Sequence, residues 1–143
     1  MSNRILCAVD VDGPQQDRAV LEVAGKLARL DNAKLDIVSV VPDFGNSMVG
    51  SYFEEGHHGK LVAGVKDKLK SLCASVLGDA LDDDARHIVA TGSVYQEILN
   101  AAEKAGSDLI VIGAYDPDLK DFLLGSNASR IVRHAKCSVH VVR

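Results

Sequence analysis

The sequence has little of what marks several classes of protein. It has no tryptophan, and aromatic residues make up 4% of its 143 residues, which disfavours a stacking platform for the bases of single-stranded nucleic acid. The formal net charge is −4 and no cluster of lysine or arginine stands out, so a duplex nucleic acid is not the expected ligand. No segment has the roughly 20 apolar residues of a membrane helix, and the first residues lack the apolar region of a signal peptide. We therefore expect a cytoplasmic protein that binds neither nucleic acid nor a membrane.

Cysteine and histidine are too scattered to predict a disulfide framework or a metal site. Cys7, Cys73 and Cys137 stand singly among apolar neighbours, with neither disulfide nor zinc spacing. His57 and His58 are adjacent, so their side chains need not converge on one ion. We expect buried, unreactive thiols and no metal-binding residues.

What the sequence does contain is a regular alternation of two hydrophobic patterns. Short apolar runs typical of buried strands cover residues 5–9, 35–41, 86–90, 109–112 and 138–142. Between them, apolar residues recur at helical spacing after Asp12-Gly13-Pro14 and over residues 61–76, 93–105 and 126–135. Near-continuous apolar strands with helices between them are typical of a parallel sheet that is covered on both faces. We therefore predict a single α/β domain, residues 1–143, with an open, parallel, five-stranded sheet.

Local signals predict finer features of this alternation. Ser93 and Gln96 have the spacing of a capping box for the third helix, and Gly106 marks the end of that helix. The acidic run over residues 82–84 predicts a turn before the third strand. Residues 43–59 form the one long irregular connection, and a connection of this length is usually mobile or functional.

The most informative segment leaves a buried strand at Gly113 and enters the last helix at Gly125-Ser126-Asn127. A helix N-terminus presents unpaired N–H groups and the positive end of the helix dipole, so it can hold an anion. Gly125 lets the backbone come close to a phosphate, and Ser126 can cap the helix or donate its hydroxyl to the anion. The same residues also suit an ordinary capped helix, and local chemistry alone favours neither interpretation.

The run LLGSNASRIVRHAKCSVHVVR, residues 123–143, resembles the universal stress protein family. The likeness extends along the chain: the first strand ends in Asp10, the second ends in SVVPD, and GSVYQEILNAA precedes LIVIGA. The sequence is most similar to the short, single-domain F/G-type branch. The resemblance implies a Rossmann-like fold of the adenine nucleotide alpha hydrolase type, with strand order 3-2-1-4-5 and helices on both faces.

The resemblance also implies an adenine nucleotide, ATP or AMP, between the first and fourth strands. Carried over by position, the adenosine end would be lined by Ala8, Val9 and Asp10, with the adenine meeting the backbone of Val40. Ile112 and Gly113 would lie beside the ribose and the first phosphate, and Gly125, Ser126 and Asn127 would hold phosphate oxygens. Residues 43–59 would be disordered or form a lid over the adenosine end. Arg18 and Lys120 could reach the phosphates, although spacing alone does not place them.

The sequence departs from the family's pattern in the phosphate loop. Asp116 stands where nucleotide-binding members have glycine, and Asp118 and Asp121 add two further negative charges nearby. Like charges a few ångströms apart repel by about 1 kcal/mol or more even near the surface. Either the carboxylates recruit Mg²⁺, which prefers oxygen ligands and phosphates, or they favour AMP or no nucleotide. The alternative function is therefore a protein-interaction module of the same fold that binds no nucleotide.

The last strand predicts the partner. The family's strand order would leave Ser138–Val142 at a sheet edge, where a bare apolar strand can pair with a second copy of the chain. We therefore expect a homodimer that acts as a stress-response sensor or regulator. No catalytic residue is expected, so any ATP hydrolysis or autophosphorylation should be slow.

Overall fold

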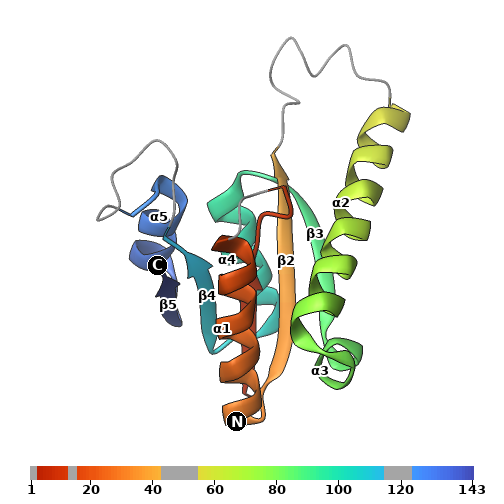
Figure 1. Ribbon diagram of the computed structural model, residues 1–143. Helices are drawn as coiled ribbons and strands as arrows, with labels where there is room; N and C mark the ends of the chain where they lie inside the picture. The colour runs from red at the N-terminus through yellow and green to blue at the C-terminus, as the bar shows by residue number, and fades with distance from the viewer. Residues whose placement is uncertain (1–2, 13–15, 43–54, 115–123) are drawn as a thin grey trace.

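The computed structural model describes residues 3–12, 16–42, 55–114 and 124–143, in which five strands alternate with helices (Figure 1). The strands are β1 (Arg4–Ala8), β2 (Lys34–Pro42), β3 (Arg86–Gly92), β4 (Leu109–Gly113) and β5 (Ser138–Val142). The helices are α1 (Gln16–Asp31), α2 (Glu55–Leu77), α3 (Asp79–Asp84), α4 (Val94–Ala105) and α5 (Ser126–His134). Each strand lies within two residues of its predicted bounds.

All five strands pair in parallel, in the order β3-β2-β1-β4-β5. Helices α1 and α2 cover one face of the sheet, and α4 lies behind the sheet in the same view (Figure 1). The predicted architecture, with its strand order and its helices on both faces, is confirmed.

Two buried cores account for the two helical layers. On the α1 and α2 face, Cys7 and Ile37 of the sheet pack with Leu21 and Leu69 of the helices. On the other face, Leu6 and its neighbours pack against α4 and α5 through Ile98 and Ile131. Because alternate residues of a strand point to opposite faces, a strand covered on both sides is expected to be mostly apolar. Each fully buried leucine or isoleucine contributes about 1.5–3 kcal/mol relative to an exposed one.

The amino end of the sheet carries a buried carboxylate. The side chain of Asp36 on β2 is fully buried, and Nη1 of Arg4 lies 3.0 Å from each of its oxygens. Arg86 adds Nε at 2.8 Å from Oδ1 and Nη2 at 3.1 Å from Oδ2. Burial by itself would raise the pKa of this carboxyl, but the hydrogen bonds and charges of Arg86 and Arg4 hold the pKa below its usual value.

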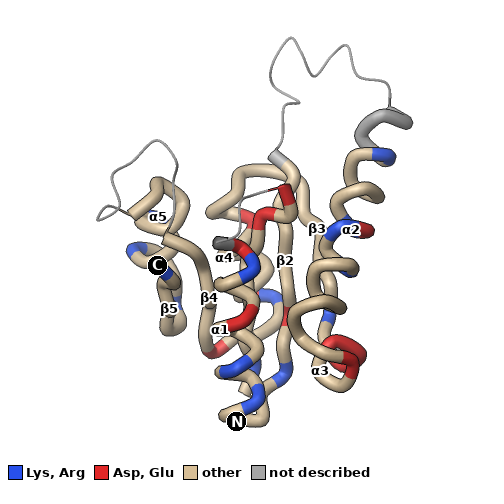
Figure 2. Tube along the Cα trace, viewed as in Figure 1, with Lys and Arg blue, Asp and Glu red and all other residues tan. Residues whose placement is uncertain are grey.

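Three local predictions were wrong in part. The acidic run lies in the short helix α3, whose charges gather at one corner of the molecule (Figure 2), and not in a turn. Helix α2 begins at Glu55, inside the segment that was predicted to be irregular, and residues 43–54 lie outside the described residues. Ser93 is the N-cap of α4 but makes no side-chain capping bond, and the Gln96 amide, which a capping box would direct back to the Ser93 N–H, donates instead to the Tyr95 hydroxyl at 3.3 Å. Gly106 ends α4 as predicted, in the left-handed conformation (φ 68°) that suits glycine.

Candidate functional site

The reversal of strand order lies between β1 and β4. From β1 the chain passes through α1 to β2 on one side, whereas β4 continues through α5 to β5 on the other. The two connecting helices lie on opposite faces of the sheet, so they diverge where β1 and β4 end. In open parallel sheets a ligand binds in the crevice that such a divergence leaves. The candidate site is therefore at the carboxyl ends of β1 and β4.

Backbone hydrogen bonds bring the start of α5 to the end of β4. The N–H of Gly125 donates to the carbonyl of Ala114 at 3.2 Å, and the N–H of Ala114 donates to the carbonyl of Val142 at 2.8 Å. Gly125 is the N-cap of α5 and is buried, whereas Ser126 and Asn127 are exposed. Ser126 is thus the first helical residue, and its hydroxyl is not used as the cap. The N-terminus of α5, with its unpaired N–H groups, opens at this edge of the sheet.

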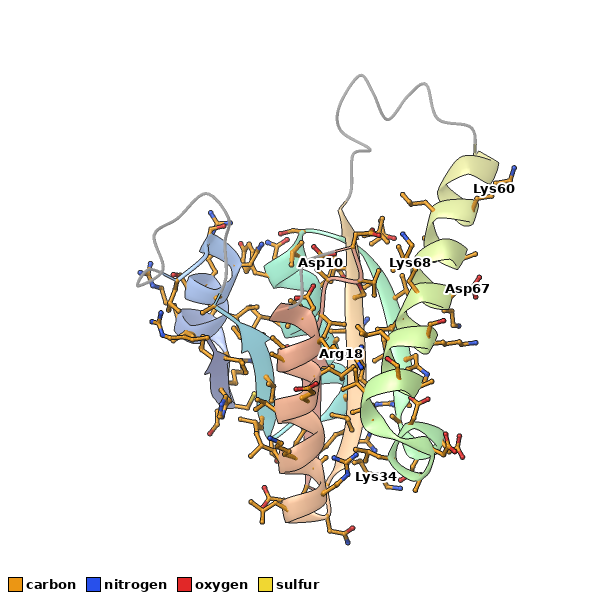
Figure 3. All side chains as sticks on the ribbon, viewed as in Figure 1. Asp10, Arg18, Lys34, Lys60, Asp67 and Lys68 are labelled. Carbon is orange, nitrogen blue, oxygen red and sulfur yellow. The ribbon has the colours of Figure 1, made fainter. Side chains whose placement is uncertain are left out.

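The end of β1 continues into a turn with two acidic residues. The N–H of Val9 donates to the carbonyl of Val38 at 3.0 Å, which extends the pairing of β1 with β2 beyond Ala8. Asp10 is exposed, and its Oδ1 accepts a hydrogen bond from the N–H of Asp12 at 3.0 Å. Asp12 in turn pairs with Nζ of Lys68 on α2 at 2.5 Å. Figure 3 shows Asp10 and Lys68 at the same end of the molecule.

A second carboxyl beside Asp10 was missed by the sequence analysis. Oδ2 of Asp17, in the first turn of α1, is buried and has no hydrogen-bond partner among the described residues. The pKa of Asp17 is raised to about 7, chiefly by burial and also by the negative charge of Asp10, whereas a hydrogen bond with the Asp10 backbone acts in the opposite direction. The only sequence signal is an acid in the first turn of a helix, which is common because it complements the helix dipole.

Strands β2 and β4 carry the remaining residues that were predicted to contact the nucleotide. Val40 on β2 is half-buried opposite Ala90 of β3, and Ile112 and Gly113 end β4. A Cβ atom on Gly113 would lie 3.2 Å from Cγ2 of Val20, so close packing of α1 is itself a reason for glycine there.

Of the two charged residues that could reach the phosphates, Arg18 is among the described residues and Lys120 is not. Arg18 lies on the side of α1 that faces α2, where its guanidinium donates to the Ser75 hydroxyl at 3.4 Å. It also lies 3.9 Å from the Glu22 carboxylate, so the structure directs it away from α5. The phosphate-loop residues Asp116, Asp118, Lys120 and Asp121 lie outside the described residues.

Two of the three cysteines are buried, as was predicted for all three. Cys7 and Cys73 are buried and free, and Cys137 is free but only half-buried. Burial raises the pKa of the Cys7 thiol far above its usual value, with smaller contributions from Cys73 and Asp17, so this thiol stays protonated.

Comparison with known proteins identifies the family. The model of the universal stress protein family matches residues 1–143, the whole chain. The chain belongs to this family. Universal stress protein G of Shigella flexneri is 49% identical over 55 residues, a match that covers 38% of this chain and 39% of that protein. Universal stress protein YxiE of Bacillus subtilis is 28% identical over 153 positions and is matched over the full length of both chains.

Solved structures of the family share the fold. Universal stress protein UspA from Lactobacillus plantarum superposes with a TM-score of 0.73 at 23% identity, covering 99% of this chain and 97% of that one. A universal stress protein from Archaeoglobus fulgidus in complex with dAMP has a TM-score of 0.62 at 17% identity, with coverages of 99% and 98%. One in complex with cAMP has a TM-score of 0.65 at 18% identity, with coverages of 99% and 97%.

The described helices do not include a membrane span. Among them, none is both long enough and apolar enough to cross a bilayer.

Proposed function

We propose that this universal stress protein binds an adenine nucleotide, ATP or AMP, at the carboxyl ends of β1 and β4, and acts as a dimeric stress-response regulator. The observation that carries the proposal is the bond from the Gly125 N–H to the Ala114 carbonyl, because it holds a helix N-terminus beside the point where the strand order reverses. Phosphate oxygens would meet the N–H groups of Ser126 and Asn127, where the helix dipole favours negative charge, and Gly125, whose own N–H is bonded to Ala114, would let the backbone come close to them.

The remaining contacts of the nucleotide follow from the strand ends. Ala8, Val9 and Asp10 would line the adenosine end, with the Val40 backbone at the adenine and Ile112 and Gly113 at the ribose. Two family members of known structure hold dAMP and cAMP, so the fold accommodates an adenosine monophosphate. ATP would be bound with Mg²⁺, which prefers phosphate and carboxylate oxygens. No catalytic residue is proposed at this site, so any hydrolysis would be slow.

The first test is the identity of any small molecule that the protein carries. The freshly purified protein is denatured, and the released solution is analysed by mass spectrometry. Stoichiometric ATP or AMP supports the proposal and identifies the nucleotide. If none is released, and titration with AMP and with Mg·ATP gives no heat, the interaction module without nucleotide becomes the better description.

A matched pair of variants tests the location of the site. Ser126→Asp places a negative charge at the start of α5, where an acid also favours the helix, so the variant should fold. Repulsion of the phosphates should weaken ATP and AMP binding at least tenfold, which corresponds to about 1.4 kcal/mol. Ser93→Asp adds the same charge at the N-cap of α4 and should leave the affinity unchanged. Equal affinities of the two variants in calorimetry would place the nucleotide elsewhere.

The dimer is proposed to form through the outer edge of β5. This strand is at the end of the strand order. Since the Val142 carbonyl accepts from Ala114, the residue that follows β4, and successive residues of a strand alternate in direction, the N–H and carbonyl of Val141 point away from β4. These are the groups that a second chain would pair with.

Removing one outward donor tests the dimer. Val141→Pro deletes an N–H on the outer edge, where proline is tolerated because the bond to β4 is kept. Sedimentation velocity should show the variant shifted towards monomer, whereas Val141→Thr, which keeps the N–H and the branched shape, should sediment as the parent does. A Val141→Pro protein that sediments as the parent does contradicts pairing through this edge.

A further inference from the structure

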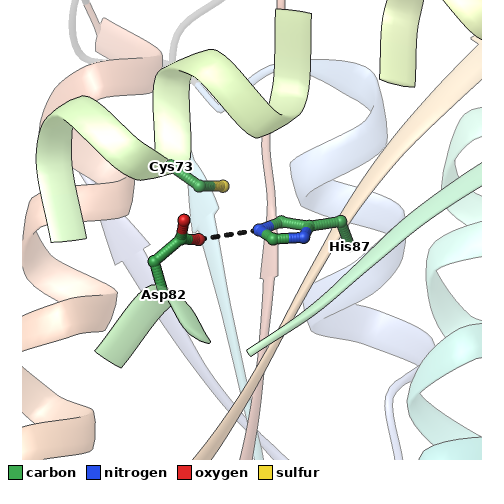
Figure 4. A group of neighbouring side chains, drawn as sticks. All are labelled: Cys73, Asp82 and His87. Carbon is green, nitrogen blue, oxygen red and sulfur yellow. Dashed lines mark hydrogen bonds and ion pairs between the residues drawn. The ribbon is translucent and has the colours of Figure 1, made fainter. Parts of the chain in front are cut away.

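Three side chains far from the candidate nucleotide site converge near the amino end of β3. They are Cys73 of α2, Asp82 of α3 and His87 of β3, and one ligand atom of each lies within 4.8 Å of the other two (Figure 4). Nε2 of His87 is 2.8 Å from Oδ1 of Asp82. The thiol of Cys73 points towards both groups (Figure 4).

The donor set favours one class of metal ion. A thiolate, an imidazole and a carboxylate are the three kinds of ligand that Zn²⁺ takes in proteins, and Co²⁺ accepts the same set. Mg²⁺ and Ca²⁺ take oxygen ligands and would use only Asp82. The cluster therefore has the chemistry of a borderline-soft transition-metal ion and differs from an ordinary acidic patch.

The donors would have to move by about 0.5–1.2 Å to reach the spacing of a tetrahedral site, since they lie within 4.8 Å of one another. With metal–ligand distances of about 2.0–2.3 Å, a tetrahedron places neighbouring ligand atoms about 3.3–3.6 Å apart. The imidazole and carboxylate would have to separate by about 0.5 Å to admit the ion, given their present 2.8 Å. Asp82 lies on a six-residue helix with no buried residue, so a shift of this size disturbs little packing.

Charge balance also favours a divalent ion here. Cys73 is fully buried, and it would bind a metal as the thiolate, the form in which cysteine ligates. A divalent ion would displace the thiol proton to solvent and bind the thiolate, the Asp82 carboxylate and one nitrogen of a neutral His87 ring. The resulting centre carries no net charge, which suits a partly buried place.

The site has one open side. The side chains of Asp82 and His87 are each 16% exposed, whereas Cys73 closes the inner side. Water could therefore supply a fourth ligand from outside. Helix α3 is rich in aspartate, and its acidic residues gather at the same corner of the molecule (Figure 2), where they attract cations.

We propose that Cys73, Asp82 and His87 form a zinc-class metal site, which ties α2 and α3 to β3 and is separate from the nucleotide site. Binding to the folded state alone would stabilise the protein in proportion to the logarithm of the metal concentration. Exposure to thiol oxidants would remove the site by consuming its thiolate.

Cobalt substitution tests the proposal directly. The full chain is freed of metal with a chelator, kept reduced with a phosphine, and titrated with Co²⁺ and with Zn²⁺. One equivalent of Co²⁺ should give a thiolate-to-cobalt charge-transfer band in the near ultraviolet together with the visible bands of a tetrahedral ion, and Zn²⁺ should abolish both. Zn²⁺ should also raise the midpoint of thermal unfolding.

Two variants and two controls locate the ion. Cys73→Ser should lose the charge-transfer band, and Cys137→Ser, which changes a half-buried thiol outside the cluster, should keep it. His87→Gln leaves the buried cysteine in place and should weaken Co²⁺ binding at least tenfold if Cys73→Ser does not fold. A His57→Ala/His58→Ala double variant should bind as the parent does.

Three results would overturn the proposal. The parent protein gives no charge-transfer band, the band persists in Cys73→Ser, or the double histidine variant loses metal binding. None of these results bears on nucleotide binding, which is measured in the same preparations.

Discussion

Asp36 and Asp17 carry carboxyl groups that are at least partly buried near opposite ends of the sheet. Their pKa values are shifted in opposite directions. At the amino end, two arginines contact Asp36 and lower its pKa. Near the carboxyl end, Asp17 has a buried oxygen without a partner and an acidic neighbour, and its pKa rises to about 7. Burial acts in the same direction on both groups, so the difference comes from the charge and hydrogen bonding of their neighbours.

The comparison separates the amino end of the sheet from the carboxyl end, where a ligand is proposed to bind. The amino end satisfies its buried charge internally. The carboxyl end has the N–H groups at the start of α5 and two neighbouring acids, Asp10 and Asp17. Perturbed carboxyls of this kind gather at functional sites, because a site optimised for ligands is not optimised for stability.

The largest effect is expected on removal of the buried charge at the amino end. Asp36→Ala leaves Arg4 and Arg86 without their common partner, and we expect a loss of about 3 kcal/mol in the free energy of unfolding. The value is at the low end for such pairs because the arginines are partly exposed. Urea unfolding at neutral pH measures it. A loss below about 1 kcal/mol would mean that the network contributes no more than a surface ion pair.

The pH dependence of stability in the same variant tests whether the pKa of Asp36 is lowered in the folded protein. Because the pKa of Asp36 is lower in the folded protein than in the unfolded chain, its contribution is present above pH of about 4 and is lost as the pH falls through the folded value. The parent should therefore lose stability in acid more steeply than Asp36→Ala does. Parallel curves for the two proteins would contradict the lowered pKa.

An intermediate effect of opposite sign is expected for Asp17. Its folded pKa of about 7 is above the unfolded value, so its contribution is full below pH of about 4 and is lost as the pH rises through 7. Asp17→Asn should match the parent near pH 4 and exceed it by about 1–2 kcal/mol at pH 8. A shift of this size in a fully buried group would give about 4 kcal/mol, but Asp17 is half-buried and solvent screens it.

A neighbouring acid on α1 provides the control for Asp17. Glu22 is exposed, so Glu22→Gln should show no comparable divergence from the parent between pH 4 and pH 8. If Asp17→Asn follows the parent at every pH, the carboxyl titrates as an ordinary exposed acid.

The smallest effect is expected from the neighbour of Asp17. Asp10→Asn removes the negative charge that contributes to the raised pKa but leaves the burial, which is the larger cause. Carboxyl-carbon NMR titration should therefore show the pKa of Asp17 lowered but still above its usual value. A pKa that falls to the ordinary range would make Asp10 the main cause, and an unchanged one would remove Asp10 from the explanation.

Much of the fold could be predicted because its signals are local. The apolar runs of β1, β2, β4 and β5 have the length and continuity that a covered parallel strand requires. The acidic run at α3 was misjudged because a helix of six residues, fewer than two turns, shows too little periodicity to detect. The capping box was predicted only in part, since Ser93 is the N-cap but the Gln96 amide bonds to Tyr95 instead of to the Ser93 N–H.

The residues of the candidate sites differ in the same way, because some could be recognised in the sequence and others only in the structure. Gly125 and Ser126 were recognisable in sequence, since a glycine and a serine at the start of a helix are a local pattern. Asp17 was not recognisable, because its burial beside Asp10 arises only when α1 packs back on β1. The metal ligands Cys73, Asp82 and His87 have no spacing typical of zinc, since three different elements carry them.

By itself, then, the sequence determined the alternation of strands and helices and the place where the last helix begins. These properties depend on hydrophobic period and on residues adjacent in the chain. The tertiary structure alone decided which buried acids are paired, and it alone brought a thiol, a carboxyl and an imidazole together. Such properties depend on distances of a few ångströms between residues that are remote in sequence, and on the exclusion of water around them.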